Sequence, residues 1–325
     1  MYETRLLSED DFRTFKTLYE DFKVRALADY KFELEPLPYE DFVDAIKQNY
    51  INCIVLYESG IPVAFLIYTT VVSEAIELNI IHSLKMENKA ERSAVLTKKF
   101  LDFTKVARRN KVVCYPMLGA QTDLISEMAI LGFKFVGIAV LRFMTTGTNS
   151  REILQLTKLS ELDRRFKVVP WSNNYTQDAV KVVNEAFKES ADALFDPRFK
   201  SIEGTADIIH KIVENIYAEF LPESTSVLLY DDKPVGFCFM NLTAGKIANI
   251  PLVAILKQYQ GLGLSKHMLK SSLQTVLRWV DAGVRPITEV NTNTETNNFA
   301  ALKMYRHLGF KEDYSYPQAY LPVKY

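Results

Sequence analysis

The sequence has few of the residues that mark a metal site, a disulfide framework or a membrane span. It contains three cysteines and four histidines in 325 residues, and neither type shows the spacing of zinc ligands. Cys53, Cys114 and Cys238 lie in apolar, strand-like segments, which is typical of buried thiols in a reducing compartment. No apolar run approaches the ~18 to 20 residues of a membrane helix, and the acidic start MYETRLLSEDDF is unlike a signal peptide. We therefore expect a cytoplasmic protein that binds neither a metal nor a membrane.

An excess of charge of one sign is also missing. The 39 basic and 40 acidic residues are well mixed and give a net charge of -1, so the chain lacks the basic field of nucleic-acid-binding proteins. Hydrophobic residues make up 48% of the chain and charged residues 24%, as in soluble globular proteins. A chain of 325 residues is long enough for two domains of ordinary size. We expect no nucleic-acid partner.

A repeat divides the sequence into two similar halves. LYESGIPVAFLIYTTV, from Leu56, and LYDDKPVGFCFMNLT, from Leu229, share an LY pair, an acidic turn, a PV pair and a phenylalanine, and each predicts a β-hairpin. AILGFKFVGIAVLRF, from Ala129, similarly matches RHLGFKEDYSYPQAYL, from Arg306. The offset between the copies is about 172 residues for the first pair and 177 for the second. A Thr-, Gly-, Asn- and Ser-rich segment then places the boundary near residue 150, which predicts domains 1–150 and 151–325.

The second half predicts a mixed α/β sheet with helices on both faces. The helix at 264–280 has the clearest pattern, because its apolar residues recur at helical spacing along one stripe. A short linker helix is expected within 153–162. The other helices are expected at 176–190, 205–220 and 297–309, and the strands at 166–171, 226–232, 234–242, 246–255, 286–292 and 318–325.

Two glycines lie one residue apart where a predicted strand leads into the 264–280 helix, in the segment KQYQGLGLS. Glycine lets the backbone approach a ligand and take positive φ, and the start of a helix offers unpaired N–H groups to an anion. The same glycines would also serve a simple helix-initiating turn. The segment is neither a Walker A loop nor GxGxxG, which disfavours nucleoside triphosphates and dinucleotides.

Two motifs in this half resemble those of the GNAT (GCN5-related N-acetyltransferase) superfamily. Gln258-x-x-Gly261-x-Gly263 resembles the family's Q/R-x-x-G-x-G/A acetyl-CoA loop. Asn298-x-x-Ala301-x-x-x-Tyr305-x-x-x-Gly-Phe resembles its second motif, in the expected order. The resemblance covers roughly residues 165–325. It implies that acetyl-CoA is the acyl donor and that an amine attacks the thioester directly in a ternary complex.

The same resemblance assigns roles to individual residues. It makes Tyr305 the general acid that protonates the coenzyme A sulfur, and it places Asn298 at the cofactor, although Asn298 is also a suitable helix cap. Main-chain groups of the fourth strand would line the pantetheine at Val253, Ala254 and Ile255. The pyrophosphate loop would consist of Gln258, Tyr259, Gln260, Gly261, Leu262, Gly263, Leu264 and Ser265.

The sequence pattern identifies the general base and the acceptor site less clearly than the cofactor loop. Glu289 is the preferred base because its strand leads toward the cofactor cleft, and the loop carboxylates Glu219, Asp196 and Glu203 stay open as alternatives. The segment between the first two helices of this half suggests acceptor contacts at Phe195, Arg198 and Phe199. A small-molecule or peptide amine is the expected acceptor. Its identity, the acyl-chain length and the choice between monomer and homodimer are not encoded in a recognisable pattern.

The first half lacks these motifs. At a fixed offset, Met86, Lys89 and Glu91 lie under Gln258, Gly261 and Gly263, and the second motif has Gln121 and Met128 under Asn298 and Tyr305. We therefore expect the first half to keep a GNAT-like fold without acetyl-CoA binding or catalysis. A different class of function stays open for the chain: a non-catalytic acyl-CoA-binding or interaction module derived from an acetyltransferase.

Overall fold

The chain folds into two compact units that do not follow a single cut in the sequence. Unit 1 comprises residues 1–136, 194–196 and 316–325, and unit 2 comprises 137–193 and 197–315. The predicted cut at 150 separates the two sequence copies, whereas the last strand of each copy contributes residues to the unit built by the other copy. The computed structural model describes residues 2–32, 35–70, 75–84, 87–119, 121–147 and 149–323.

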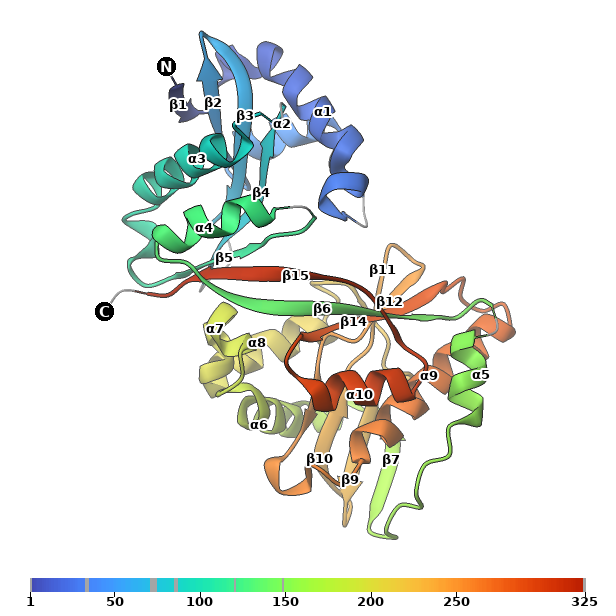
Figure 1. Ribbon diagram of the computed structural model, residues 1–325. Helices are drawn as coiled ribbons and strands as arrows, with labels where there is room; N and C mark the ends of the chain where they lie inside the picture. The colour runs from blue at the N-terminus through green and yellow to red at the C-terminus, as the bar shows by residue number, and fades with distance from the viewer. Residues whose placement is uncertain are drawn as a thin grey trace. The chain divides into compact units, whose positions relative to one another are not determined.

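Unit 1 contains a sheet in the order β1-β2-β3-β4-β5-β15, in which β4 and β5 are parallel (Figure 1). Its strands are β1 Tyr2–Leu6, β2 Asn52–Glu58, β3 Ile61–Thr69, β4 Ala75–Ser83, β5 Val112–Pro116 and β15 Lys311–Leu321. Its helices are η1 Glu9–Asp11, α1 Phe12–Tyr30, α2 Tyr39–Lys47, α3 Lys89–Phe103, η2 Ala107–Arg109 and α4 Thr122–Ile130.

Unit 2 contains two sheets, in the orders β7-β9-β10-β13 and β6-β14-β12-β11-β8. Helices α6 and α8 pack on one side of the first sheet and α9 on the other (Figure 1). The strands are β6 Lys134–Met144, β7 Phe166–Pro170, β8 Glu219–Phe220, β9 Ser226–Tyr230, β10 Lys233–Cys238, β11 Asn241–Thr243, β12 Ile247–Asn249, β13 Val253–Ile255 and β14 Glu289–Glu295. The helices are α5 Asn149–Leu156, η3 Asn173–Tyr175, α6 Thr176–Phe187, α7 Asp192–Phe195, η4 Pro197–Lys200, α8 Ile202–Val213, η5 Lys257–Tyr259, α9 Leu264–Asp281 and α10 Phe299–His307.

The strand expected at 246–255 is split into β12 and β13, and the split opens a fork in the sheet of unit 2. Ala248 and Ile250 face the core under α9 and α10, whereas Leu252 and Ala254 face the core under α6 and α8. The alternation of side chains therefore slips by one residue, as in a β-bulge. Ile250 N–H still bonds the carbonyl of Asn291 on β14 (2.9 Å), but the carbonyl of Leu252 accepts from Phe239, beside β10 (3.0 Å). Beyond this point β13 and β14 diverge.

Other boundaries differ modestly from expectation. The 264–280 helix is observed as α9, whereas the expected 205–220 helix ends early at Val213 and its tail forms β8. The last strand begins earlier, at Lys311, because it extends across both units. Of the residues expected in that strand, 324 and 325 lie outside the described part of the chain.

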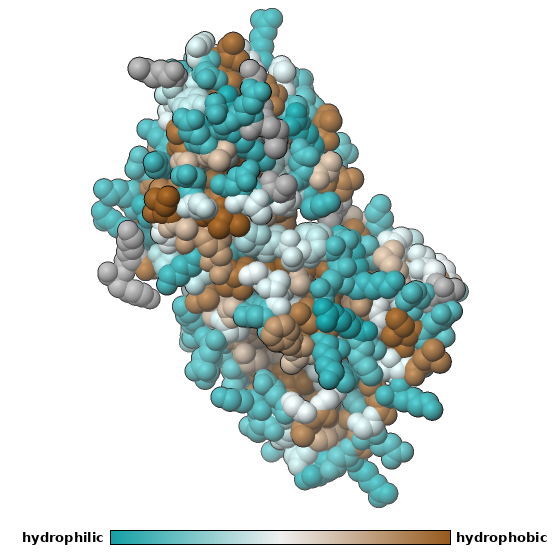
Figure 2. Space-filling model, in the orientation of Figure 1, coloured by the Kyte–Doolittle hydropathy of each residue, from teal (hydrophilic) through white to brown (hydrophobic). Residues whose placement is uncertain are grey.

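The exposed surface is mixed in polarity. On the face drawn in Figure 2, hydrophobic residues form separate patches among hydrophilic ones. Among the described residues, none of the helices has the length and apolar composition that a membrane crossing requires.

Candidate active site

The glycine-containing loop connects η5 to α9, and both glycines take the left-handed backbone conformation. Gly261 has φ 77° and Gly263, the N-cap of α9, has φ 75°. A Cβ atom built on either glycine meets no atom within 4 Å. Crowding by the protein therefore does not explain these glycines. The positive φ, which L side chains rarely adopt, remains as the reason that the structure itself gives for them.

The loop is fixed from behind by aromatic packing. The ring of Tyr259 lies 5.8 Å from that of Phe166 and 5.1 Å from that of Tyr230, measured between centroids. The Gln260 side-chain Nε2 donates to the carbonyl of Ile255 at the end of β13 (2.9 Å). These contacts hold the loop beside the open end of the fork.

The environment of the loop suits an anion. The first turn of α9 presents the N–H groups that a helix leaves without intrahelical partners, at the positive end of its dipole. Lys257 precedes the glycines and Lys266 follows them. The pKa of His267 is lowered by burial and by the neighbouring charges of Lys270 and Lys266, so this imidazole is neutral at pH 7.

One wall of the fork offers main-chain hydrogen-bonding groups. The carbonyl of Leu252 and the N–H of Leu256 bond toward β10 and its flanks, and β13 pairs with β10 in antiparallel register. Because N–H direction alternates along a strand, the N–H groups of Val253 and Ile255 point away from β10, into the fork. An extended ligand chain can pair with them there.

Tyr305 reaches the fork from α10. Its side chain is buried, with 4% of the residue exposed, and its hydroxyl oxygen lies 3.4 Å from the Thr292 hydroxyl on β14. Burial raises the pKa of Tyr305 above its ordinary value, so the phenol stays protonated at neutral pH. When Thr292 donates to the phenol oxygen, the phenolic proton is left for another acceptor.

Comparisons with known proteins relate the second half of the chain to acetyltransferases. Residues 222–312 match the family model of the acetyltransferase (GNAT) domain. Over this segment the chain is similar to GNAT acetyltransferase domains. Over 147 residues, which are 44% of this chain and 82% of the relative, the sequence is 24% identical to N-alpha-acetyltransferase 30 of Schizosaccharomyces pombe (strain 972 / ATCC 24843).

Two solved structures extend the likeness over the whole chain. A GCN5-related N-acetyltransferase from Sphaerobacter thermophilus matches with a TM-score of 0.65 and 14% identity, covering 100% of this chain and 96% of that one. A tandem GNAT protein from the clavulanic acid biosynthesis pathway matches with a TM-score of 0.57 and 11% identity, covering 100% and 99%. At such identities the likeness shows the fold, and the fold is two tandem GNAT-like domains.

Asn298 has a structural role at the start of α10. Its side-chain Oδ1 accepts a hydrogen bond from the Ala301 N–H (3.1 Å), so it caps the helix that carries Tyr305. The Asn of the second GNAT motif is thus accounted for by helix capping, and its predicted contact with the cofactor stays a prediction.

Glu289, the predicted base, lies in an ion pair. Its carboxylate accepts from Arg142 on β6, which also donates to Asp313 (2.8 Å). A carboxylate held by an arginine is less able to accept a proton than a free one, so this ion pair favours a role for Glu289 in binding β14 to β6.

A second carboxylate on the same strand, Glu295, was not singled out from the sequence. Burial, together with the negative charge of Asp192 on α7, raises the pKa of Glu295. The charge of Asp192 also acts to raise the pKa of Tyr305, although burial is the main cause. The only sequence signal for Glu295 was its place at the end of the strand that leads to the cleft.

The three residues predicted to contact the acceptor have other partners. Phe195 lies in the 194–196 segment of unit 1 and packs edge-on against Tyr320, with centroids 5.4 Å apart. Arg198 donates to Asp207 (2.7 Å), and Phe199 is buried in the core of unit 2. These positions give all three a packing role. The sequence could not separate this from an acceptor role, because the segment shows no periodicity.

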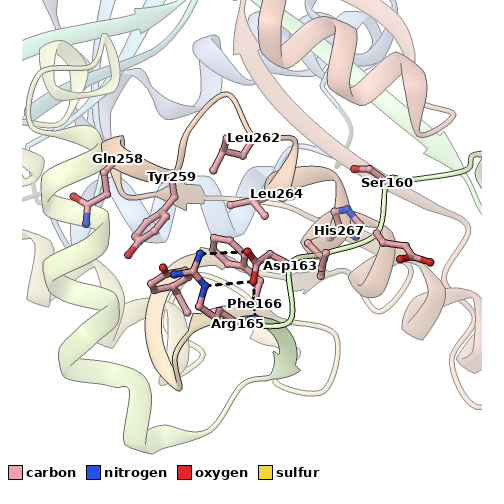
Figure 3. A pocket seen from close by; sticks show the side chains of 12 residues that line it. Ser160, Asp163, Arg165, Phe166, Gln258, Tyr259, Leu262, Leu264 and His267 are labelled. Carbon is pink, nitrogen blue, oxygen red and sulfur yellow. Dashed lines mark hydrogen bonds and ion pairs between the residues drawn. The ribbon is translucent and has the colours of Figure 1, made fainter.

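An open pocket of about 400 Å³ lies beside the loop. In Figure 3, Tyr259 and Phe166 lie close to Arg165, whose guanidinium pairs with Asp163. Leu262 and His267 line other parts of the pocket, so it shares residues with the loop and with α9. Its volume is in the range of small-ligand sites.

Proposed function

We propose that unit 2 is an acetyl-CoA-dependent N-acetyltransferase that moves an acetyl group to a primary amine. The observation that carries this proposal is the meeting of three features at one fork: the glycine loop at the start of α9, the free N–H groups of Val253 and Ile255, and the protonated phenol of Tyr305. Fold alone would not suffice, because one fold serves many chemistries.

Successive parts of acetyl-CoA, from the nucleotide to the thioester, fit successive features of this site. The pyrophosphate lies against the backbone of residues 259–265, where the helix dipole and the flanking lysines offset its charge. The pantetheine arm, with the thioester carbonyl at its end, pairs with Val253 and Ile255 as an extra strand, so that the thioester carbonyl meets Val253 and an amide of the arm meets Ile255. The open pocket that shares Tyr259 and Leu262 with the loop takes the nucleotide end.

The reaction needs a neutral amine and a protonated leaving group. The amine nitrogen attacks the thioester carbon, and the carbonyl oxygen, while negative, accepts from the Val253 N–H. The tetrahedral intermediate then collapses, the C–S bond breaks, and Tyr305 gives its proton to the departing sulfur. Glu295 accepts the proton lost by the amine, directly or through water, because its raised pKa brings it closer to the working pH.

Calorimetry with acetyl-CoA tests the cofactor site. Gly263→Glu places a bulky anion where the phosphates lie, and we expect affinity to fall by tenfold or more. Gly283→Glu is the matched control, because Gly283 also has positive φ (65°) with no atom within 4 Å of its Cβ, yet follows the far end of α9. Both variants lose about 1–2 kcal/mol of stability from the strained backbone. Equal acetyl-CoA binding by the two would overturn the loop assignment.

The alternative of a non-catalytic acyl-CoA-binding module makes a different prediction. It expects wild-type protein to bind acetyl-CoA and to release no thiol with any amine beyond the rate of spontaneous hydrolysis. The protonated Tyr305 at the fork favours the enzyme, since a binding module has no need of a buried phenol at the thioester.

A further inference from the structure

A row of asparagines crosses the second sheet of unit 2 directly before the fork. Asn241 on β11 is paired with Asn249 on β12, and Asn249 is paired with Asn291 on β14. Their neighbours Leu242, Ala248 and Val290 form a parallel row that points into the core under α9 and α10. Because side chains alternate along each strand, the three asparagines point to the opposite face.

The first asparagine of the row is unsatisfied. Asn241 is 4% exposed, and among the described residues its Oδ1 atom has no hydrogen-bond partner. Asn249 by contrast donates to the Thr243 hydroxyl (2.7 Å). An unpaired buried amide is costly to a folded protein, and sites that must bind a polar ligand are among the places where such a cost is retained.

The same positions in unit 1 are also polar in part. The pairing of β4 with β5 matches that of β12 with β14, so Cys114 corresponds to Asn291 and Glu77 to Asn249. Thr69, which is paired with Glu77, corresponds to Asn241, and among the described residues its hydroxyl oxygen likewise has no hydrogen-bond partner. A polar row is thus common to both units, and what distinguishes unit 2 is that all three of its side chains are amides.

The charges on the face restrict what it can bind. Where β6 pairs with β14, the strand positions of this face carry one basic side chain, Arg142, and it is already bound to Glu289 and Asp313. Glu295 lies farther along β14 on the same face. A positively charged amine is thus accommodated near the fork, whereas a carboxylate on the same molecule meets acidic side chains and an occupied arginine.

We propose, building on the proposed function, that this row binds the acceptor, and that the acceptor is a compact primary amine on a polyhydroxylated skeleton without a carboxylate. Side-chain amides present a donor and an acceptor together, which suits neighbouring hydroxyl groups. The row runs across three strands, about 10 Å in all, at right angles to the strand direction. An extended peptide pairs along a strand edge and would not follow such a row.

Thiol release from acetyl-CoA, measured with a matched set of amines, tests the proposal. Glucosamine, cyclohexylamine and glucosaminic acid are respectively a ring with hydroxyls, a ring without them and a hydroxylated amine with a carboxylate. We expect kcat/KM for glucosamine to exceed each of the others by tenfold or more. A higher value for cyclohexylamine, glucosaminic acid or a peptide with a free N-terminus overturns the proposal.

The variant Asn241→Leu separates binding from structure. Leucine removes the unsatisfied amide, so we expect the midpoint of thermal unfolding to hold or rise while KM for glucosamine rises about tenfold and acetyl-CoA affinity is unchanged. Asn184→Leu is the control, because that amide donates to the Phe199 carbonyl (2.8 Å) and its loss lowers the midpoint without altering the amine preference. A lower midpoint for Asn241→Leu with unchanged KM gives Asn241 a structural role and overturns the proposal.

The two proposals fail in distinguishable ways. Absence of acetyl-CoA binding, or of thiol release with every amine, contradicts the proposed function. Transfer to amines of another class with normal acetyl-CoA affinity contradicts only the assignment of the asparagine row.

Discussion

The two units differ most in the loop that precedes the third long helix of each repeat. The paired strands match Ser83 with Ile255, and the helix N-caps match Asn88 with Gly263, so the loop of unit 2 is three residues longer. Asn88 takes φ 59° and Gly263 takes φ 75°. A left-handed N-cap can therefore be built without glycine. The extra length and the second glycine are what distinguish a loop that can surround a phosphate.

This comparison corrects the fixed-offset alignment of the two sequences. Asn88, and not Glu91, corresponds to Gly263, because the three-residue difference falls inside the loop. Because Glu91 does not take the position of Gly263, a clash of its carboxylate with a phosphate does not explain why unit 1 lacks the motif. Met86, the predicted counterpart of Gln258, lies outside the described residues.

Unit 1 has a corresponding fork where β4 and β5 stop pairing, beyond Glu77 and Cys114, and the two forks differ as well. Matched strand pairs and helix caps place Tyr115 where unit 2 has Thr292, and Met128 where it has Tyr305. The Tyr115 hydroxyl donates to Gln121 and is hydrogen-bonded by the backbone of Ile81, the counterpart of Val253. The backbone group that points into the fork of unit 2 thus bonds a buried phenol in unit 1. A tyrosine is present near both forks, but the hydroxyl of the one in unit 1 is engaged by groups of the protein itself.

Removing each phenol in turn is the strongest test of this difference. Tyr305→Phe should lower kcat by about 10²-fold or more, because the sulfur then leaves without a proton, while acetyl-CoA affinity is retained. Tyr115→Phe should leave kcat unchanged and cost about 1–3 kcal/mol of stability through unpaired buried groups. Steady-state kinetics with calorimetry and urea melts measure both. An equal loss of kcat in the two variants would remove the functional distinction between the forks.

The acid limb of the pH–rate profile tests the base of unit 2. Because burial and Asp192 raise the pKa of Glu295, its active ionised form is lost as pH falls through a value above the ordinary range of a glutamate. Asp192→Asn removes part of the cause, so we expect the limb of kcat/KM to shift to lower pH. Glu295→Gln should lower kcat/KM by about 10²-fold. If the acid limb of kcat/KM lies at the same pH in Asp192→Asn as in the wild type, the assignment of Glu295 as the base is contradicted.

A smaller effect should distinguish the stability of the units in acid. His82 of β4 is buried and hydrogen-bonded to Tyr30 and Asp21, whereas the matching position in unit 2 is Ala254. Burial lowers the pKa of His82 to about 4 against the pull of Asp21, and the positive charges of Arg25 and Lys89 act in the same direction as burial.

The direction of this change of stability with pH follows from proton binding at His82. Between about pH 6.5 and 4 the unfolded chain binds a proton at His82 that the folded unit does not, so the contribution of His82 to stability is present above this window and lost through it. We expect unit 1 to exchange amide hydrogens faster at pH 5 than at pH 7.5, after correction for intrinsic rates, and unit 2 to change less. His82→Gln should reduce this dependence; an unchanged dependence would place its origin elsewhere.

Local patterns were sufficient for part of the result. The apolar stripe of α9, the cap at Asn298 and the position of Tyr305 on α10 all follow from residues within a few turns of each other. The two glycines and the second motif identified the acetyltransferase half for the same reason. Each of these features depends on neighbours in the chain, and sequence spacing reports such neighbours directly.

The sequence by itself determined that the chain holds two copies of one α/β domain and that the second carries the GNAT motifs. Only the tertiary structure decided that the last strand of each copy contributes residues to the unit built by the other copy, and that the two loops differ in length by three residues. It also decided that the Tyr115 side chain occupies the fork of unit 1 and that Glu289 forms an ion pair with Arg142. Each of these depends on which strand pairs with which, in what register. Some of these pairings join residues more than a hundred positions apart, as that of Glu289 with Met144 does, and no local pattern in the chain encodes them.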